Sequence, residues 1–254
     1  MKAQTSILLG LLLLTFLPLA FPVKASIENA GLELPFTHVP FVESFEGTWC
    51  PPCMQNMRPA FERLYEHDWN PHDHPVHIVE IHLGSYDPLT VDDGIEVASY
   101  YSVTGIPTYV VDGGYAIQVG AANPDSAYEK LCSDINSAGK RSVPEIHMLV
   151  SGTIRGRTLK TTIRIYNPGS EEFSGLLTVY VVEDNVTAYS SVTGQDETFR
   201  FVLRKVLAFN SFIMIQPDSI SSEYFQWSVP SSYNSKNIIV VAAIRDIETK
   251  FYIQ

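Results

Sequence analysis

Apolar residues follow two different periods along the chain. Between Thr37 and Gly139, alternating apolar runs predict strands, and apolar positions at helical spacing predict helices, a combination typical of an α/β domain. The strands are expected at 38–45, 76–83, 108–111 and 115–119, and the helices at 53–69, 92–102 and 124–138.

After Arg141 the helical period disappears, and short β-branched runs alternate with polar turns. Runs at this spacing predict an all-β, immunoglobulin-like sandwich. Its strands are expected at 145–152, 157–166, 175–183, 198–207, 211–216, 222–229, 237–245 and 250–253. We therefore expect an α/β domain over 26–142 and a β-sandwich domain over 143–254.

Residues 1–25 have the pattern of a signal peptide. Lys2 precedes an apolar stretch over 7–21, and Val23-Lys24-Ala25 suits cleavage before Ser26. The stretch is shorter than the roughly 20 apolar residues that span a bilayer, so we expect no stable membrane span. The mature protein is then extracytoplasmic: periplasmic, in the cell envelope, or secreted.

Composition narrows the classes of partner and site. The chain has 28 acidic and 17 basic side chains, a formal net charge of −11 at pH 7, and such a surface repels phosphate backbones. Nucleic acid is therefore not expected as a partner. The 3 cysteines are too few for a disulfide-dense scaffold or for a four-cysteine zinc site.

Two of the cysteines stand where a strand passes into a helix, in Cys50-Pro51-Pro52-Cys53. A spacer of this length lets both sulfurs meet at the first helical turn. Unpaired N–H groups and the positive end of the helix dipole favour a thiolate there, so Cys50 is expected to be the nucleophile. Cys53, inside the turn, is expected to be the shielded partner.

With its flanking tryptophan, Trp49-Cys50-Pro51-Pro52-Cys53 resembles the active-site motif of the thioredoxin superfamily, and Gly105-Ile106-Pro107-Thr108 resembles its cis-proline loop. The resemblance implies an α/β thioredoxin fold ahead of the all-β immunoglobulin-like sandwich domain. It also implies a redox disulfide between Cys50 and Cys53, a cis Ile106–Pro107 bond beside it, and substrate binding by Trp49, Ile106 and Pro107. No cofactor is implied.

The resemblance therefore implies an exported thiol–disulfide oxidoreductase. Its partners would be protein thiols or disulfides and a redox donor or acceptor in the same compartment. A different hypothesis is a redox-inactive module with a structural disulfide that acts in binding or envelope assembly. A third is metal delivery by the cysteine pair together with the nearby histidines His67, His72, His74 and His77.

One detail of the redox site, the acid that assists the inner thiol, stays open at this point. Ser44 stands where thioredoxins have a buried aspartate that assists the inner thiol, and Glu43, Glu46 and Glu80 are the candidates to replace it. Alternation along the strands does not decide among them. The remaining cysteine, Cys132, shares a helical face with apolar residues and is expected to be buried and inert.

Overall fold

The computed structural model describes residues 31–67 and 75–254, which form twelve β-strands, three α-helices and one π-helical turn. The strands are β1 (Phe41–Glu46), β2 (His77–His82), β3 (Thr108–Val111), β4 (Ala116–Val119), β5 (His147–Arg155), β6 (Thr158–Asn167), β7 (Phe173–Glu183), β8 (Val186–Ser190), β9 (Gln195–Phe199), β10 (Val202–Ile215), β11 (Ser219–Ser228) and β12 (Ile238–Asp246). The helical segments are η1 (Cys53–Met57), α1 (Arg58–His67), α2 (Asp92–Tyr100) and α3 (Pro124–Gly139).

A mixed sheet of seven strands is the largest unit, in the order β12-β7-β10-β2-β1-β3-β4. Strand β1 pairs in parallel with β2 and antiparallel with β3. The other edge of β2 pairs in parallel with β10 at Glu80 and Val202. Strands from both halves of the chain therefore belong to one sheet.

The expected fold class, an α/β thioredoxin fold followed by a separate all-β immunoglobulin-like sandwich, is therefore wrong. Strand β10 lies against β2, and β7 and β12 extend the same sheet. The prediction failed because alternation shows which side chains of a strand are buried and not which strand lies beside it.

The elements themselves agree better with the sequence pattern in the first half than in the second. All seven expected elements of the first half are present within a few residues of their predicted bounds. In the second half, the expected strands 198–207 and 211–216 are one bulged strand, β10, and the hairpin β8–β9 was not predicted. The segment 250–253 forms only an isolated bridge between Tyr252 and Arg245.

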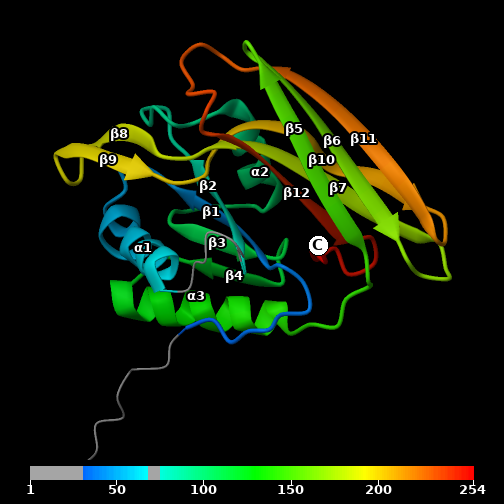
Figure 1. The fold of residues 1–254 in the computed structure, drawn as a ribbon. Coiled ribbons are helices and arrows are strands. Elements are labelled where there is room, and N and C mark those ends of the chain that lie inside the picture. Colours follow the sequence, from blue (N-terminus) through cyan, green and yellow to red (C-terminus); the bar gives the residue numbers. More distant parts are fainter. Residues whose placement is uncertain (1–30, 68–74) are drawn as a thin grey trace, which may run out of the picture.

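Helices cover the β1–β4 part of the sheet on both faces. On one face, α1 and α3 bury Phe61, Leu64, Leu131 and Ile135. On the other face, α2 packs Val97 against a cluster that β1, β2 and the second half of the chain also supply. Figure 1 shows α3 along the bottom of the sheet with α1 beside it.

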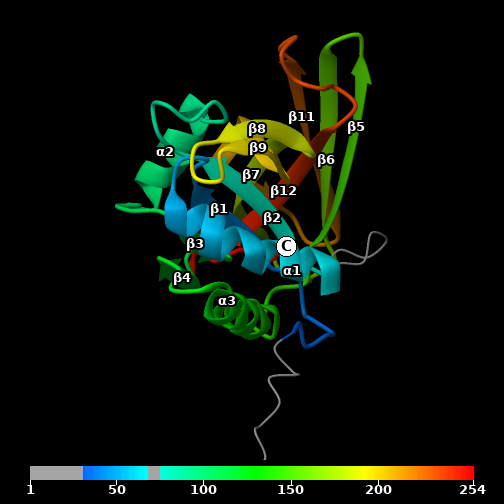
Figure 2. The same cartoon turned by 90° about the vertical axis from the view of Figure 1, so that its left-hand side faces the viewer.

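The β12-β7-β10 part of the sheet packs instead against a second sheet, in the order β11-β6-β5. Ile163 and Ile165 of β6 meet Val179 of β7 and Ile244 of β12 in this layer. Figure 2 shows β5, β6 and β11 standing away from the helices. Two layers of strands therefore pack face to face, as in a sandwich, but one of these layers continues into the β1–β4 region as a single sheet.

A buried ion pair with its hydrogen bonds links side chains from the two halves of the chain on one face of the sheet. Glu43 of β1 accepts hydrogen bonds from Tyr101 at 2.5 Å and from Tyr180 of β7 at 2.6 Å. Arg245 of β12 lies 3.9 Å from the same carboxylate, donates to Tyr252 at 2.9 Å, and is 0% exposed. The first half of the chain therefore completes its core with residues from beyond the expected boundary at 142/143, which itself stays a prediction.

The predicted signal peptide, 1–25, lies outside the described residues. Within 31–67 and 75–254, no helix is both long enough and apolar enough to cross a membrane.

Replacing Arg245 with leucine leaves the Glu43 carboxylate buried without its cation. We expect the free energy of unfolding to fall by about 3–5 kcal/mol, the usual cost of breaking a buried pair from one side. Urea denaturation followed by circular dichroism measures it. Arg155→Leu, on an exposed part of β5, is the control and should change stability by less than about 0.5 kcal/mol. Equal losses in both variants would contradict a stabilising role for the pair.

Candidate functional site

The alternation of side chains along β1 places its two glutamates on opposite faces of the sheet. Val42 packs in the cluster under α1 and α3, whereas Phe45 packs in the cluster on the α2 face. Glu46 therefore shares the α1 face with Val42, and Glu43 points to the other face, where it meets Arg245. Because η1 and α1 follow directly, Glu46 is the β1 glutamate on the cysteine side.

A tryptophan and two glycines shape the loop after β1. The indole Nε1 of Trp49 donates to the Leu83 carbonyl at 2.9 Å, and its ring covers Gly47 and Gly84. A Cβ atom would lie 2.8 Å from Nε1 at Gly47 and 2.5 Å from it at Gly84, which also has a φ of +121°. Close approach and backbone conformation together require glycine at 84. Trp49 stays 45% exposed, on the solvent side of the loop.

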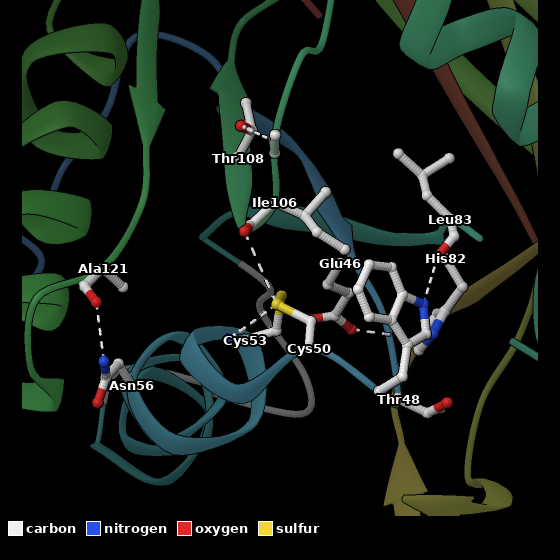
Figure 3. The surroundings of a disulfide bond; sticks show 12 residues. Glu46, Thr48, Cys50, Cys53, Asn56, His82, Leu83, Ile106, Thr108 and Ala121 are labelled. Atoms are coloured by element: carbon white, nitrogen blue, oxygen red, sulfur yellow. Dashed lines mark hydrogen bonds and ion pairs between the residues drawn. A yellow bond between two sulfur atoms is a disulfide. The ribbon is translucent and has the colours of Figure 1, made fainter. Parts of the chain in front are cut away.

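Cys50 and Cys53 form a disulfide with an Sγ–Sγ distance of 2.06 Å, where the loop enters η1 (Figure 3). Pro51 and Pro52 have no N–H, so the first amide available to the sulfurs is that of Cys53, which donates to Cys50 Sγ at 3.2 Å. The two cysteines are 2% and 1% exposed, so exposure does not distinguish them. The hydrogen bond from the Cys53 amide to Cys50 Sγ does distinguish the two sulfurs.

The Ile106–Pro107 bond is cis, as the sequence predicts. The Ile106 carbonyl oxygen lies 3.7 Å from Cys50 Sγ. Two hydrogen bonds of 2.7 Å hold the loop around the proline. Thr108 Oγ1 donates to the Gly105 carbonyl, and the Gly120 amide donates to the Pro107 carbonyl. Of the predicted substrate-binding residues, Trp49 and Ile106 therefore both adjoin the disulfide loop, and Pro107 follows at the buried end of β3.

A buried polar cluster lies on the same face of the sheet. Glu80 and His82 alternate with apolar residues of β2, and Glu46 pairs with His82 in the register of the two strands. His82 Nδ1 lies 3.1 Å from Asp87 Oδ2, and Nε2 lies 3.3 Å from Glu46 Oε1. Figure 3 draws Glu46 and His82 together beside the disulfide. Among the three acids considered from the sequence, Glu46 and Glu80 thus lie on this face and Glu43 does not.

Burial and neighbouring charges shift the pKa values of Glu80 and His82 strongly. Burial raises the pKa of Glu80 well above its usual range, and the neighbouring Glu46 carboxylate adds to the rise. Burial lowers the pKa of His82, but the carboxylates of Asp87 and Glu46 outweigh it and raise that pKa to about 9. Perturbed groups of this kind gather at functional sites more than elsewhere in proteins.

The second half of the chain also reaches the site, which the sequence analysis missed. Ser190 of β8 donates its hydroxyl to the Thr48 carbonyl at 2.7 Å, and Arg58 of α1 donates to the Thr198 carbonyl of β9 at 2.7 Å. Figures 1 and 2 both show the β8–β9 hairpin over α1. The alternation of apolar Val186 and Ala188 with Thr187 and Tyr189 was the available sequence signal, and the structure buries Val186 and Ala188.

The other candidates lie apart from this site or outside the described residues. Cys132 is buried in α3, outside the disulfide, as expected. His72 and His74 of the histidine-rich segment lie outside the described residues, as does the His67 side chain, and His77 begins β2. Sequence reasoning also passed over His82 and Asp87, although the spacing of Glu80 and His82 on a strand places both on one face.

Comparison with known proteins supports the single-sheet architecture. No protein-family model and no curated protein matches the chain. Among solved structures, HBP35 of Porphyromonas gingivalis is 16% identical with a TM-score of 0.59, over 87% of this chain and 74% of its own. Because 87% of the chain exceeds either expected domain, the shared fold crosses the boundary at 142/143. At this identity the likeness concerns the fold alone.

Two β-glucosidases overlap the chain only weakly. The enzyme from Listeria innocua in complex with isofagomine is 13% identical over 45% of this chain and 16% of its own, with a TM-score of 0.26. EmGH1 from Erythrobacter marinus is 10% identical over 71% of this chain and 28% of its own, also with a TM-score of 0.26. Neither overlap carries an argument about this protein.

The packing of Trp49 on Gly84 can be tested against a second glycine with similar backbone geometry. Gly114 has a φ of +114°, close to that of Gly84, but a Cβ there would meet nothing within 4 Å. Gly114→Ala should therefore show backbone strain alone, about 1–3 kcal/mol, in urea denaturation. Gly84→Ala should cost more, because the indole must also move.

Repeating both changes in a Trp49→Ala background separates strain from collision. The excess cost at Gly84 should disappear there, and the cost at Gly114 should not change. An excess that survives without the indole would contradict the proposed packing.

Proposed function

We propose that this protein is an exported thiol–disulfide oxidoreductase, in which Cys50 and Cys53 exchange electrons with cysteines of other extracytoplasmic proteins. The observation that carries the proposal is the position of the disulfide. It stands at the first turn of a helix, with the Cys53 amide 3.2 Å and the Ile106 carbonyl 3.7 Å from the same sulfur, Cys50 Sγ.

The amide and the carbonyl suit different stages of an exchange reaction. When the pair is reduced, the Cys53 N–H can hold a Cys50 thiolate by a charge-assisted hydrogen bond, and the helix dipole adds to this stabilisation. The Ile106 carbonyl is in turn an acceptor for the backbone N–H of a substrate segment lying against the sulfur. Both groups favour Cys50 as the atom that meets the substrate.

The reaction follows from this assignment. In the reducing direction, the Cys50 thiolate attacks one sulfur of a substrate disulfide, the substrate S–S bond breaks, and the second substrate sulfur leaves as a thiolate. The Cys53 thiolate then attacks Cys50 Sγ, re-forms the Cys50–Cys53 bond, and releases the first substrate sulfur. Two electrons pass to the substrate, and two protons from solvent complete its thiols. Oxidation of a substrate dithiol is the same sequence reversed.

The surroundings of the pair fit a protein substrate. Trp49 is 45% exposed, and together with the exposed Pro51 it presents apolar surface to solvent beside the sulfurs. Tyr86, which follows Gly84 by two residues, is 94% exposed. Exposed aromatic side chains of this kind suit contact with a partner chain. Together with the signal-peptide pattern of 1–25, the disulfide suits an oxidising, extracytoplasmic compartment.

Serine variants of the two cysteines test the assignment of roles. Cys53→Ser should trap a substrate protein on Cys50 as a mixed disulfide, because the resolving thiol is missing. Cys50→Ser should form no such adducts, because the attacking thiolate is missing. Non-reducing gels of both variants, made in the native compartment and followed by mass spectrometry of the adducts, measure this difference.

Cys132→Ser is the matched control for this experiment, since Cys132 is buried in α3 and is not part of the disulfide. It should change neither pattern. Adducts on Cys53 in the Cys50→Ser protein, with none on Cys50 in the other variant, would reverse the assignment. Absence of adducts in both variants would favour a structural disulfide in a redox-inactive binding module.

A further inference from the structure

The cluster of Glu46, Glu80 and His82 has a feature that disulfide exchange does not require. A carboxylate oxygen from each glutamate and a ring nitrogen of His82 lie within 4.8 Å of one another. The three residues are 5%, 6% and 2% exposed, so water does not solvate this group of donors freely. Two carboxylates buried side by side are costly unless protons or a cation neutralise them.

His82 is oriented as metal-binding histidines are. Asp87 Oδ2 accepts the Thr48 amide at 2.6 Å and lies 3.1 Å from His82 Nδ1, so it fixes the orientation of the ring through Nδ1. Nε2 faces Glu46, and within residues 31–67 and 75–254 this buried nitrogen has no hydrogen-bond partner. A metal ion bound there would displace the proton from Nε2. A carboxylate that fixes one ring nitrogen while the other faces further carboxylates is the usual outer arrangement of a metal-bound histidine.

The distances suit a small cation. Bonds of about 2.1 Å to nitrogen and oxygen in tetrahedral geometry place two donors about 3.4 Å apart. His82 Nε2 and Glu46 Oε1 are 3.3 Å apart, close to this spacing. The three donor atoms lie within 4.8 Å of one another. To reach the same spacing, the Glu80 carboxylate has to move toward the other two donors by up to about 1.4 Å. Its Oε2 is held by the Arg200 amide at 3.1 Å, which leaves Oε1 for a ligand.

Arg58 is one guanidinium that acts on Glu80, and it forms ion pairs with two other carboxylates. Arg58 contributes to the field at Glu80, but its side chain pairs with Glu62 at 2.8 Å and with Glu197 at 3.4 Å. Three carboxylates, those of Glu46, Glu80 and Asp87, thus surround one histidine, and a bound cation would displace protons from this group.

We propose that Glu46, Glu80 and His82 bind one divalent metal ion of the zinc class, with Asp87 as the residue that positions His82. An imidazole beside two carboxylates favours Zn²⁺ or a neighbouring transition metal over Ca²⁺ and Mg²⁺, which take all-oxygen ligands. None of its donors is a cysteine, so this proposal does not rest on disulfide exchange.

Zinc titration of the oxidised full-length mature protein tests the site, since a disulfide has no thiolate to offer. Isothermal titration with Zn²⁺ alone should show a single class of binding that is lost in His82→Gln and in Glu46→Gln. Asp87→Asn should retain binding but weaken it about 10- to 100-fold. Mg²⁺ should give no binding under the same conditions.

His72→Gln/His74→Gln is the matched control, because those histidines belong to the other metal hypothesis. It should bind zinc like the wild type. Loss of binding in this double variant, with retention in His82→Gln, would overturn the proposal. So would wild-type oxidised protein that takes up no zinc, in which case protons alone occupy the cluster.

Cobalt provides a readout that does not depend on any variant folding. Co²⁺ added to the oxidised wild type should give the visible absorption of a low-coordinate nitrogen and oxygen site. Octahedral, solvent-like Co²⁺ spectra would contradict the proposed ligand set.

Discussion

The arrangement of this protein depends on one buried carboxylate. Glu43 lies inside the sheet, where burial raises its pKa against the opposing effects of Arg245 and the tyrosine hydroxyls. The carboxylate meets these partners only when the side chains of Tyr180 from β7 and Arg245 from β12 reach the α2 face of β1. The C-terminal strands therefore complete the site of an N-terminal glutamate, and the two halves of the chain pack around one shared core.

The same strand carries the candidate functional site on its other face. Because side chains alternate, fixing Glu43 toward Arg245 turns Glu46 toward α1 and the disulfide. The chain then leaves β1 directly into the Trp49 loop and the Cys50–Cys53 turn. The β8–β9 hairpin returns from the second half to hold the Thr48 carbonyl. A rigid strand between two cores thus positions the proposed redox pair and the proposed metal ligands together.

Sequence reasoning reached the local parts of this site and missed its long-range parts. The spacing of Cys50 and Cys53 and the Ile106–Pro107 loop are short-range signals, and the disulfide and the cis peptide bond that they predict are present. The pairing of Glu80 with Val202 joins strands more than a hundred residues apart, and periodicity contains no information on such partners. For the same reason the choice between Glu43 and Glu46 stayed open until the tertiary contacts of β1 were known.

The central claim is that the Cys50–Cys53 bond exchanges electrons instead of only bracing the loop. Its reduction potential tests this most directly, measured by equilibration with dithiothreitol or glutathione buffers and mass spectrometry of alkylated thiols. A potential between about −270 mV, as in reducing thioredoxins, and about −120 mV, as in strong oxidants, is the predicted result. A potential below about −300 mV, typical of structural disulfides in secreted proteins, would contradict the claim.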